Sequence, residues 1–278
     1  MSWQDAAGAW HGAAGAEARI ASLVPSVTEL LFALGLGPRV VARTGFCIHP
    51  GPAVRAVAKV GGTKDVRLER LRALAPTHVI VNVDENRRET VDEIRAFVPH
   101  VIVTHPCAPE DNLALYRLLG GIFGREAEAG ALCGALETVL AQARARPWPA
   151  RRVLYAIWQD PWMTVSRDTY ISRMLALVNW QTWPAAQATP QACVDGDCSR
   201  PNAPDTRYPS FRWSDALVRE LDLVLLSTEP YRFTEAHADA LERQLGKEVL
   251  LVDGEMVSWY GSRAVDGVRY LADLAAQV

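Results

Sequence analysis

Residues 19–46 read RIASLVPSVTELLFALGLGPRVVARTGF, and this stretch decides the fold. A β-rich run is followed by a helix pattern and then by a second β-rich run. Pro25 suits the first turn of that helix, and Gly35 or Gly37 suits its end. The alternation continues through the amphipathic VRLERLRALAP, the apolar THVIVNV, the helical NRRETVDEIRAFVP and the apolar HVIVTH. The pattern predicts a parallel sheet with helices on both faces.

The rest of the chain predicts a second lobe of the same kind. Residues 109–147 indicate helix almost throughout, and their second piece is about 20 residues long, or about 30 Å. Strand and helix patterns then alternate again, interrupted by a long connection over residues 179–209 that contains Cys193 and Cys198. We therefore predict an α/β chain of two Rossmann-like lobes, divided into a disordered arm 1–18, a lobe 19–123, a rigid bridging helix 124–148 and a lobe 149–278.

Composition excludes several classes of protein. The chain has 278 residues, 49% apolar and 22% charged, which is typical of globular proteins. A net charge of −3 indicates no nucleic-acid partner, and no stretch reaches the ~18 apolar residues of a membrane span. Five cysteines and an N-terminus without a basic, then apolar, leader favour the cytoplasm, with the periplasm as the alternative if a leader lies outside the sequence. We also expect a monomer.

Candidate binding residues follow the predicted strands, because ligands of open parallel sheets bind beyond the carboxyl ends of the strands. Aromatic rings gather there, and they suit a large, flat, partly apolar ligand. Any one of the nine tryptophans is as readily a core residue. The strand-end candidates are Phe46, Cys47, His49, Asn86, Arg87, Trp158, Trp162, Glu229, Tyr231, Trp259 and Tyr260.

Catalytic and metal-binding patterns are sparse. No nucleophile elbow, zinc-protease helix or dinucleotide fingerprint occurs. Cys47 with His49, and His105 with Cys107, form two short ligand pairs that would suit tetrahedral zinc if the fold brought them together. We expect no resident metal and keep this zinc site as an alternative. Glu229 would need a paired group if it is buried, and Arg207, Arg232 or Arg263 could supply it.

The stretches 19–46, KVGGTKDVRLERLRALAPTHVIV, RRVLYAIWQDPWMTVSRDTYISRMLALV and DLVLLSTEPYRF resemble the vitamin B12-binding, BtuF-like substrate-binding proteins. These belong to the class III, helical-backbone group that also carries ferric siderophores and haem. The resemblance covers about residues 19–278 in order. It implies two α/β lobes, a rigid bridging helix and a ligand held in a cleft between the lobes.

The resemblance also implies roles for single residues. The cleft aromatics of the family fall near Phe46, at Trp162 or Trp158, at Tyr208 and around Trp259, whereas Thr63 stands where the B12 carriers have another aromatic. The family docks on an ABC permease through one glutamate in each lobe. Glu69 matches the first of these, and Asp215 (or its neighbour Ser214) stands at the second.

These observations leave three hypotheses. The first is a non-catalytic protein that binds a corrinoid such as cobalamin, or a similar planar, metal-bearing ligand, with no catalytic cofactor. The second is a ferric-siderophore, haem or other anionic chelate receptor, for which Arg43, Lys64, Arg87 and Arg207 would supply positive charge. The third is a cytosolic enzyme or sensor that uses Cys47 as nucleophile and His49 as base.

Overall fold

The computed structural model describes residues 1–185 and 207–278. The chain divides into two compact units, and each is described by itself below. Unit 1 comprises residues 1–106, 110–136 and 260–263, and unit 2 comprises residues 107–109, 137–259 and 264–278. The predicted α/β class with parallel sheets is confirmed in both units. Cys193 and Cys198 lie outside the described residues.

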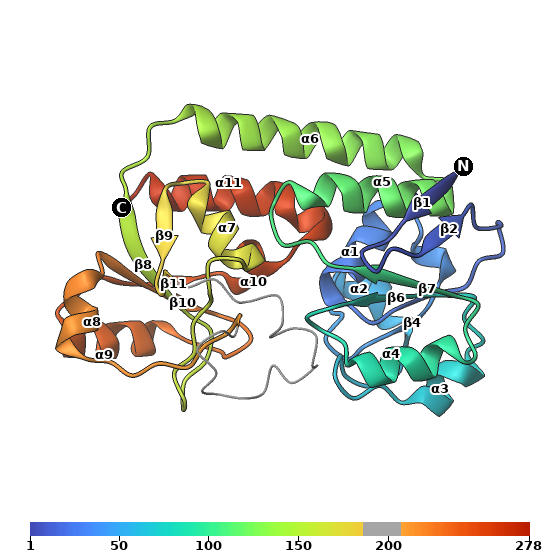
Figure 1. The fold of residues 1–278 in the computed structure, drawn as a ribbon, viewed down its shortest axis with the longest axis horizontal. Helices are drawn as coiled ribbons and strands as arrows, with labels where there is room; N and C mark the ends of the chain where they lie inside the picture. The colour runs from blue at the N-terminus through green and yellow to red at the C-terminus, as the bar shows by residue number, and fades with distance from the viewer. Residues whose placement is uncertain (186–206) are drawn as a thin grey trace. The chain divides into compact units, whose positions relative to one another are not determined.

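Unit 1 is built on a five-stranded parallel sheet with the strand order β5-β4-β3-β6-β7. In Figure 1, α3 and α4 cover one face of this sheet, and α1 and α5 lie on the other. The elements are β3 (Ile20–Ser22), α1 (Pro25–Ala33), η1 (Gly37–Arg39), β4 (Val40–Arg43), α2 (Gly51–Arg55), β5 (Ala58–Lys59), α3 (Leu68–Ala73), β6 (His78–Asn82), α4 (Arg88–Arg95), β7 (His100–Thr104) and α5 (Asp111–Phe123).

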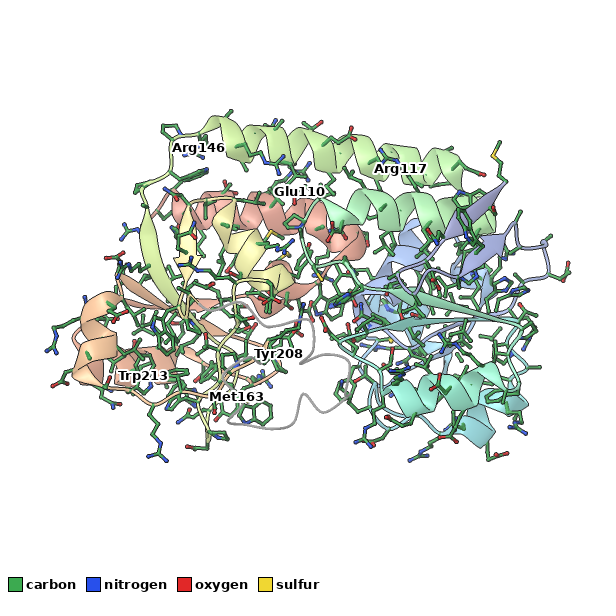
Figure 2. The ribbon with its side chains drawn as sticks, in the orientation of Figure 1. Glu110, Arg117, Arg146, Met163, Tyr208 and Trp213 are labelled. Carbon is green, nitrogen blue, oxygen red and sulfur yellow. The ribbon has the colours of Figure 1, made fainter. Side chains whose placement is uncertain are left out.

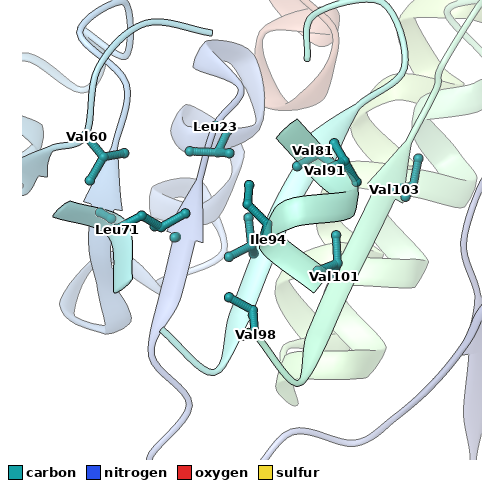
Figure 3. Close-up of a cluster of buried hydrophobic side chains, with 12 residues drawn as sticks. Leu23, Val60, Leu71, Val81, Val91, Ile94, Val98, Val101 and Val103 are labelled. Carbon is teal, nitrogen blue, oxygen red and sulfur yellow. The ribbon is translucent and has the colours of Figure 1, made fainter. Parts of the chain in front are cut away.

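The core of unit 1 follows from the predicted periodicities. Apolar side chains of the strands meet the apolar stripes of α3 and α4 in one cluster, shown in Figure 3. Leu71 on α3 and Ile94 on α4 are both fully buried against strand residues such as Val81. Pro25 occupies the first turn of α1, and Gly35 follows its end with φ +72°, as the sequence predicts.

The first residues are not the disordered arm that their small side chains predict. β1 (Ser2–Gln4) and β2 (Trp10–Gly12) form an antiparallel hairpin. Inside it, a carboxylate oxygen of the buried Asp5 lies 3.0 Å from His11 Nε2 and also accepts a hydrogen bond from the backbone N–H of Val103. Composition alone cannot predict this ordered hairpin, because one hydrogen bond to the buried Asp5 carboxylate comes from β7, about a hundred residues further along the chain.

Helix α5 ends at Gly124, whose φ of +67° is the left-handed cap of the helix. α6 (Glu126–Ala145) follows and has 20 residues, the length that the sequence predicts. Its residues up to 136 belong to unit 1 and the others to unit 2.

Unit 2 holds a four-stranded parallel sheet with the order β11-β10-β8-β9. Its α8 and α9 lie on one face, and α7 and α11 on the other (Figure 1). The elements are β8 (Arg151–Ala156), α7 (Tyr170–Ala176), β9 (Trp180–Thr182), α8 (Asp215–Glu220), β10 (Leu223–Ser227), α9 (Glu235–Leu245), β11 (Val249–Val252), α10 (Gly254–Ser258) and α11 (Ala264–Ala275), with η3 (Gly261–Arg263) in unit 1.

Strand β9 corrects the prediction that the connection from residue 179 is a loop throughout. It is too short for a periodic signal, and it forms because β8 offers a parallel partner in the register Arg151 to Trp180. Residues 207–211 also pair with residues 162–166, for example through Phe211 N–H to Trp162 O at 2.9 Å. Met163 and Tyr208 of these two segments can be located in Figure 2.

Candidate binding edges of the two units

Each sheet has one point where the chain reverses the direction in which it adds strands. In unit 1 this switch lies between β3 and β6, and in unit 2 it lies between β8 and β10. The connections that leave the two strands at such a point go to opposite faces of the sheet, which opens a crevice at their carboxyl ends. We call the carboxyl ends of the strands, with the loops that follow them, the carboxyl edge of each unit.

The carboxyl edge of unit 1 exposes apolar side chains. Phe46 and Ile48 follow β4 and are 63% and 52% exposed, and Val83 follows β6 and is 42% exposed. The ring of Phe46 passes close to Gly62, since a Cβ added there would lie 3.4 Å from it. Exposed apolar groups along the carboxyl edge of a parallel sheet are typical of a binding surface. The predicted position of Phe46 at this edge is thus an accessible one, whereas Ile48 and Val83 were missed.

A carboxylate stands at the switch point of unit 1. Glu85 follows β6, and its Oε1 accepts a hydrogen bond of 2.8 Å from the hydroxyl of Tyr260. Burial, together with the neighbouring carboxylate of Glu85, raises the pKa of Tyr260 well above its ordinary value. Tyr260, predicted as a ligand contact, is therefore a buried donor that holds Glu85 in place.

Two other residues of unit 1 that were predicted to bind a ligand, Cys47 and Asn86, are buried and hydrogen-bonded within the unit. Cys47 is fully buried, and its sulfur lies 3.1 Å from the Thr28 hydroxyl and 3.2 Å from that of Thr44. Burial raises the pKa of the Cys47 thiol, which does not favour the nucleophile of the third hypothesis. The buried Asn86 donates to the carbonyl oxygens of Leu23 and Thr63, so it fixes the loop that carries Thr63.

The cationic residues of unit 1 also have partners. Arg43 is buried and donates to the carbonyl oxygens of Val54 and Cys47 at 2.8 and 3.0 Å, so its predicted role with an anionic ligand is wrong. Lys64 donates to the carbonyl oxygen of Asp84 at 2.8 Å. Arg87 lies 3.6 Å from Asp65, and both side chains are well exposed.

The carboxyl edge of unit 2 presents a pair of aromatic rings. Trp158 follows β8 and is 40% exposed, and Tyr231 follows β10 and is half-buried. Their ring centroids are 5.5 Å apart at 75°, an edge-to-face contact. The backbone N–H of Tyr231 also bonds to the carbonyl of Ile157. The structure thus brings together two of the predicted rings at the switch point of this unit.

Glu229 is the matching carboxylate of unit 2. Its Oε1 accepts hydrogen bonds of 2.7 Å from the Ser258 hydroxyl and from the indole Nε1–H of Trp259. Burial raises the pKa of Glu229, and these two donors oppose the shift. Glu229 also lines a hollow of about 290 Å³ at the ends of β10 and β11. Trp259 is only 7% exposed, so it positions Glu229 rather than offering a free ring face.

Trp162 lies in the core cluster of unit 2. It stacks on Phe233 with centroids 5.8 Å apart at 8°, and it meets Trp213 edge to face at 5.6 Å. Figure 2 labels Trp213. The cluster continues with buried residues of α8, α9 and β10. Of the two alternatives offered by the sequence, Trp158 rather than Trp162 presents an exposed ring.

Arg207 and Tyr208 begin the segment that follows the undescribed residues. Arg207 is buried, and its two terminal nitrogens each lie 3.8 Å from the sulfur of Cys107. Asp168 lies 3.9 Å from the same guanidinium. Arg207 therefore has partners other than Glu229, and Tyr208 is half-buried beside it in the sequence.

The alternative zinc site is not assembled. His105 has Asp84 at 3.5 Å, His49 is half-buried, and Cys47 is bound by hydroxyls. Within residues 1–185 and 207–278, no three metal-ligating side chains gather in a group that would hold an ion. Over the same residues, no helix is long and apolar enough to cross a membrane. Glu69 and Asp215 are exposed in the first turns of α3 and α8, and their docking role stays a prediction.

Comparison with known proteins decides the family. Residues 20–203 match the family described as "Periplasmic binding protein". The chain belongs to the periplasmic binding protein family. The resemblance seen in the sequence is confirmed by this match and by the relatives that follow.

Relatives of this periplasmic binding protein agree with the fold. A vitamin B12-binding protein of Photorhabdus laumondii is 29% identical over 100 residues, 36% of each chain, so the match spans about a third of that relative. An uncharacterized ABC transporter substrate-binding lipoprotein of Bacillus subtilis is 24% identical over 92% of this chain and 79% of its own.

Solved structures show the same fold. The periplasmic vitamin B12 binding protein BtuF of Vibrio cholerae superposes with a TM-score of 0.73 at 17% identity, covering 94% of this chain and 98% of that chain. The periplasmic heme-binding protein RhuT of Roseiflexus sp. RS-1 gives 0.71 at 22% identity, covering 94% and 97%. The predicted class III periplasmic-binding fold is thereby confirmed.

Proposed function

We propose that this chain is a non-catalytic binding protein for a corrinoid or a similar planar, metal-bearing macrocycle. The observation that carries the proposal is the exposure of flat, apolar side chains at both carboxyl edges, with Phe46 on unit 1 and Trp158 on unit 2. Rings of this kind bind a planar ligand through buried area at a low cost in conformational entropy. The names of the B12-binding relatives support the choice of ligand class.

Haem is the second candidate. It is also a planar metal macrocycle, and heme-binding proteins are among the structures with the same fold. The third hypothesis, an enzyme with Cys47 as its nucleophile, is not proposed, because the thiol is buried and hydrogen-bonded.

The family suggests both a protein partner and a cellular compartment for this chain. We infer an ABC permease as the partner, with exposed Glu69 and Asp215 as its contacts. The description of the family as periplasmic, and the lipoprotein relative, favour the periplasmic alternative over the cytoplasm that the cysteine count suggested.

The test is a titration of the purified chain with cyanocobalamin and with haemin, followed by tryptophan fluorescence and by calorimetry. Trp158→Ala should weaken binding at least about tenfold, as expected for a ring that contacts a ligand. The matched control is Trp10→Ala, which removes a 66% exposed tryptophan from the N-terminal hairpin. No binding of either compound at high micromolar concentration would refute the proposal, and so would equal affinities of the two variants.

A further inference from the structure

A second hollow lies in unit 1, at the end of its sheet opposite the carboxyl edge. We call the amino ends of β3, β4 and β5, with the segments that lead into them, the amino edge of unit 1. We infer that this hollow binds a long-chain carboxylate, that is, a single acyl tail with an anionic head. All of its lining residues belong to unit 1, so the site does not depend on the proposed function.

The hollow has the size and the lining of a site for a hydrocarbon chain. Its volume is about 700 Å³, within the roughly 300–1,000 Å³ usual for small-molecule sites. Apart from one arginine, every lining residue is apolar or glycine, and an acyl tail gains free energy by leaving water for such surroundings. The lining residues are Arg19, Phe32, Gly35, Gly37, Pro38, Val40, Val41, Ala53, Ala56, Val57, Ala58 and Leu74.

The apolar lining is recessed. A Cβ on Gly37 would lie 2.6 Å from the ring of Phe32, so the glycine leaves room for this ring in the wall. Phe32, Val41, Val57 and Leu74 are all half-buried, and none of them stands out from the surface. A bilayer surface is bound by apolar side chains that protrude into the lipid. The recessed lining therefore favours a single tail that enters the hollow over a membrane surface.

Arg19 supplies a fixed positive charge to the lining. Its Nε donates to the carbonyl oxygen of Ala75 at 3.1 Å, and its Nη2 donates to that of Leu74 at 2.7 Å. Carbonyl groups hold the guanidinium in place but do not neutralise it, and within residues 1–185 and 207–278 no carboxylate forms an ion pair with Arg19. A carboxylate head at the hollow would form a charge-assisted hydrogen bond with this guanidinium.

The charge around the hollow is positive, although the whole chain has a net charge of −3. Residues 30–64, which supply most of the lining, contain five basic residues and no acidic one. Among them Arg55 and Lys59 are exposed, whereas Arg39 donates to the carbonyl oxygens of Gly15 and Phe123. This local excess of positive charge complements an anionic head and disfavours a cationic one.

Calorimetric titration of the unmodified chain tests the class of ligand. The probes are dodecanoate, its shorter homologues and dodecyltrimethylammonium, each below its micelle concentration. Dodecanoate should bind at one site per chain, at least about tenfold tighter than the ammonium compound. The affinity should rise roughly twofold to fourfold for each methylene added from octanoate onward, because each one enters apolar surroundings.

Two pairs of variants test the place of binding. Ala56→Trp fills the hollow from an exposed position and should weaken dodecanoate at least about tenfold, whereas Ala96→Trp, at the equivalent exposed C-cap of α4, should not. Arg19→Gln should weaken dodecanoate severalfold, and Arg88→Gln at the start of α4 should leave it unchanged. Thermal unfolding checks each fold. Arg55→Gln, which removes an exposed cation, should weaken binding at low salt only and replaces Arg19→Gln if that variant does not fold.

Four outcomes overturn the inference: no binding of dodecanoate, equal binding of the ammonium compound, equal dodecanoate affinities of Ala56→Trp and Ala96→Trp, and binding to phosphatidylglycerol vesicles without binding of dodecanoate. Titration of Ala56→Trp with cyanocobalamin and haemin separates the two proposals. Unchanged macrocycle binding together with lost dodecanoate binding supports a separate site, whereas equal losses of both show one shared site and overturn the inference. Failure of the unmodified chain to bind any macrocycle refutes the proposed function alone.

Discussion

Stability of unit 1 should depend on pH through His78. This residue begins β6, is 6% exposed, and stacks on His100, its register partner on β7, with ring centroids 4.6 Å apart. Phe123 meets the ring edge-on, and Thr77 Oγ1 lies 2.9 Å from Nδ1. Burial, and then the positive charges of His100, Arg39 and His11, lower the pKa of His78 from 6.5 to about 4.

The lowered pKa of His78 determines how the free energy of unfolding changes with pH. Protonation of His78 is less favourable in the folded chain than in the unfolded chain. Its contribution to the free energy of unfolding is therefore complete above pH 6.5, and it is lost between pH 6.5 and 4, where the unfolded chain takes up a proton on this histidine and the folded chain does not. A difference of this size corresponds to a loss of about 2 kcal/mol at pH 5 and about 3 kcal/mol below pH 4. Replacement by an uncharged ring of similar size, His78→Phe, should remove that part of the pH dependence.

The assay is urea unfolding at pH 7.5 and pH 5, combined with an NMR titration of the imidazole of His78. The unmodified chain should lose about 2 kcal/mol more than His78→Phe between these two pH values. His237→Asn, which replaces the imidazole that accepts from the N-cap of α9, serves as the histidine control. The same pH dependence in the unmodified chain and His78→Phe, or an NMR pKa near 6.5, would refute the reasoning.

Three further predictions concern single side chains. Arg263→Met should lower the free energy of unfolding by about 2–3 kcal/mol in urea melts, because it removes two hydrogen bonds of 2.9 and 2.7 Å from the half-buried Glu29; unchanged stability would contradict the pairing. Gly267→Ala should destabilise by more than about 2 kcal/mol in thermal melts, since its Cβ would lie 2.2 Å from a backbone carbonyl oxygen; a neutral result would show that α11 shifts freely. Cys107 should be alkylated faster than the buried Cys47 in peptide mass spectrometry, because it is half-exposed beside a guanidinium; the reverse order would exclude this reasoning.

The sequence predicted most of the fold because its signals are local. The strands β3, β4, β6 and β7 are apolar runs of the kind that a sheet covered on both faces requires, and the stripe of α3 is visible as Leu68, Leu71 and Leu74, spaced three residues apart. The length of α6 also follows from its own residues. Elements as short as β5 and β9 carry no periodic signal, and they exist only because a neighbouring strand supplies their hydrogen bonds.

Only part of the candidate site could be predicted from the sequence, because the residues that bury or hydrogen-bond its side chains lie far from them along the chain. The chain by itself determined the parallel α/β architecture and the rule that chemistry lies at strand ends, so Phe46, Trp158 and Glu229 could be named in advance. Tertiary structure alone decided that Trp158 is exposed whereas Trp162 stacks on Phe233. It also decided that Glu229 is held by Trp259. Burial and hydrogen bonding depend on residues that meet only after folding, and no local pattern records them.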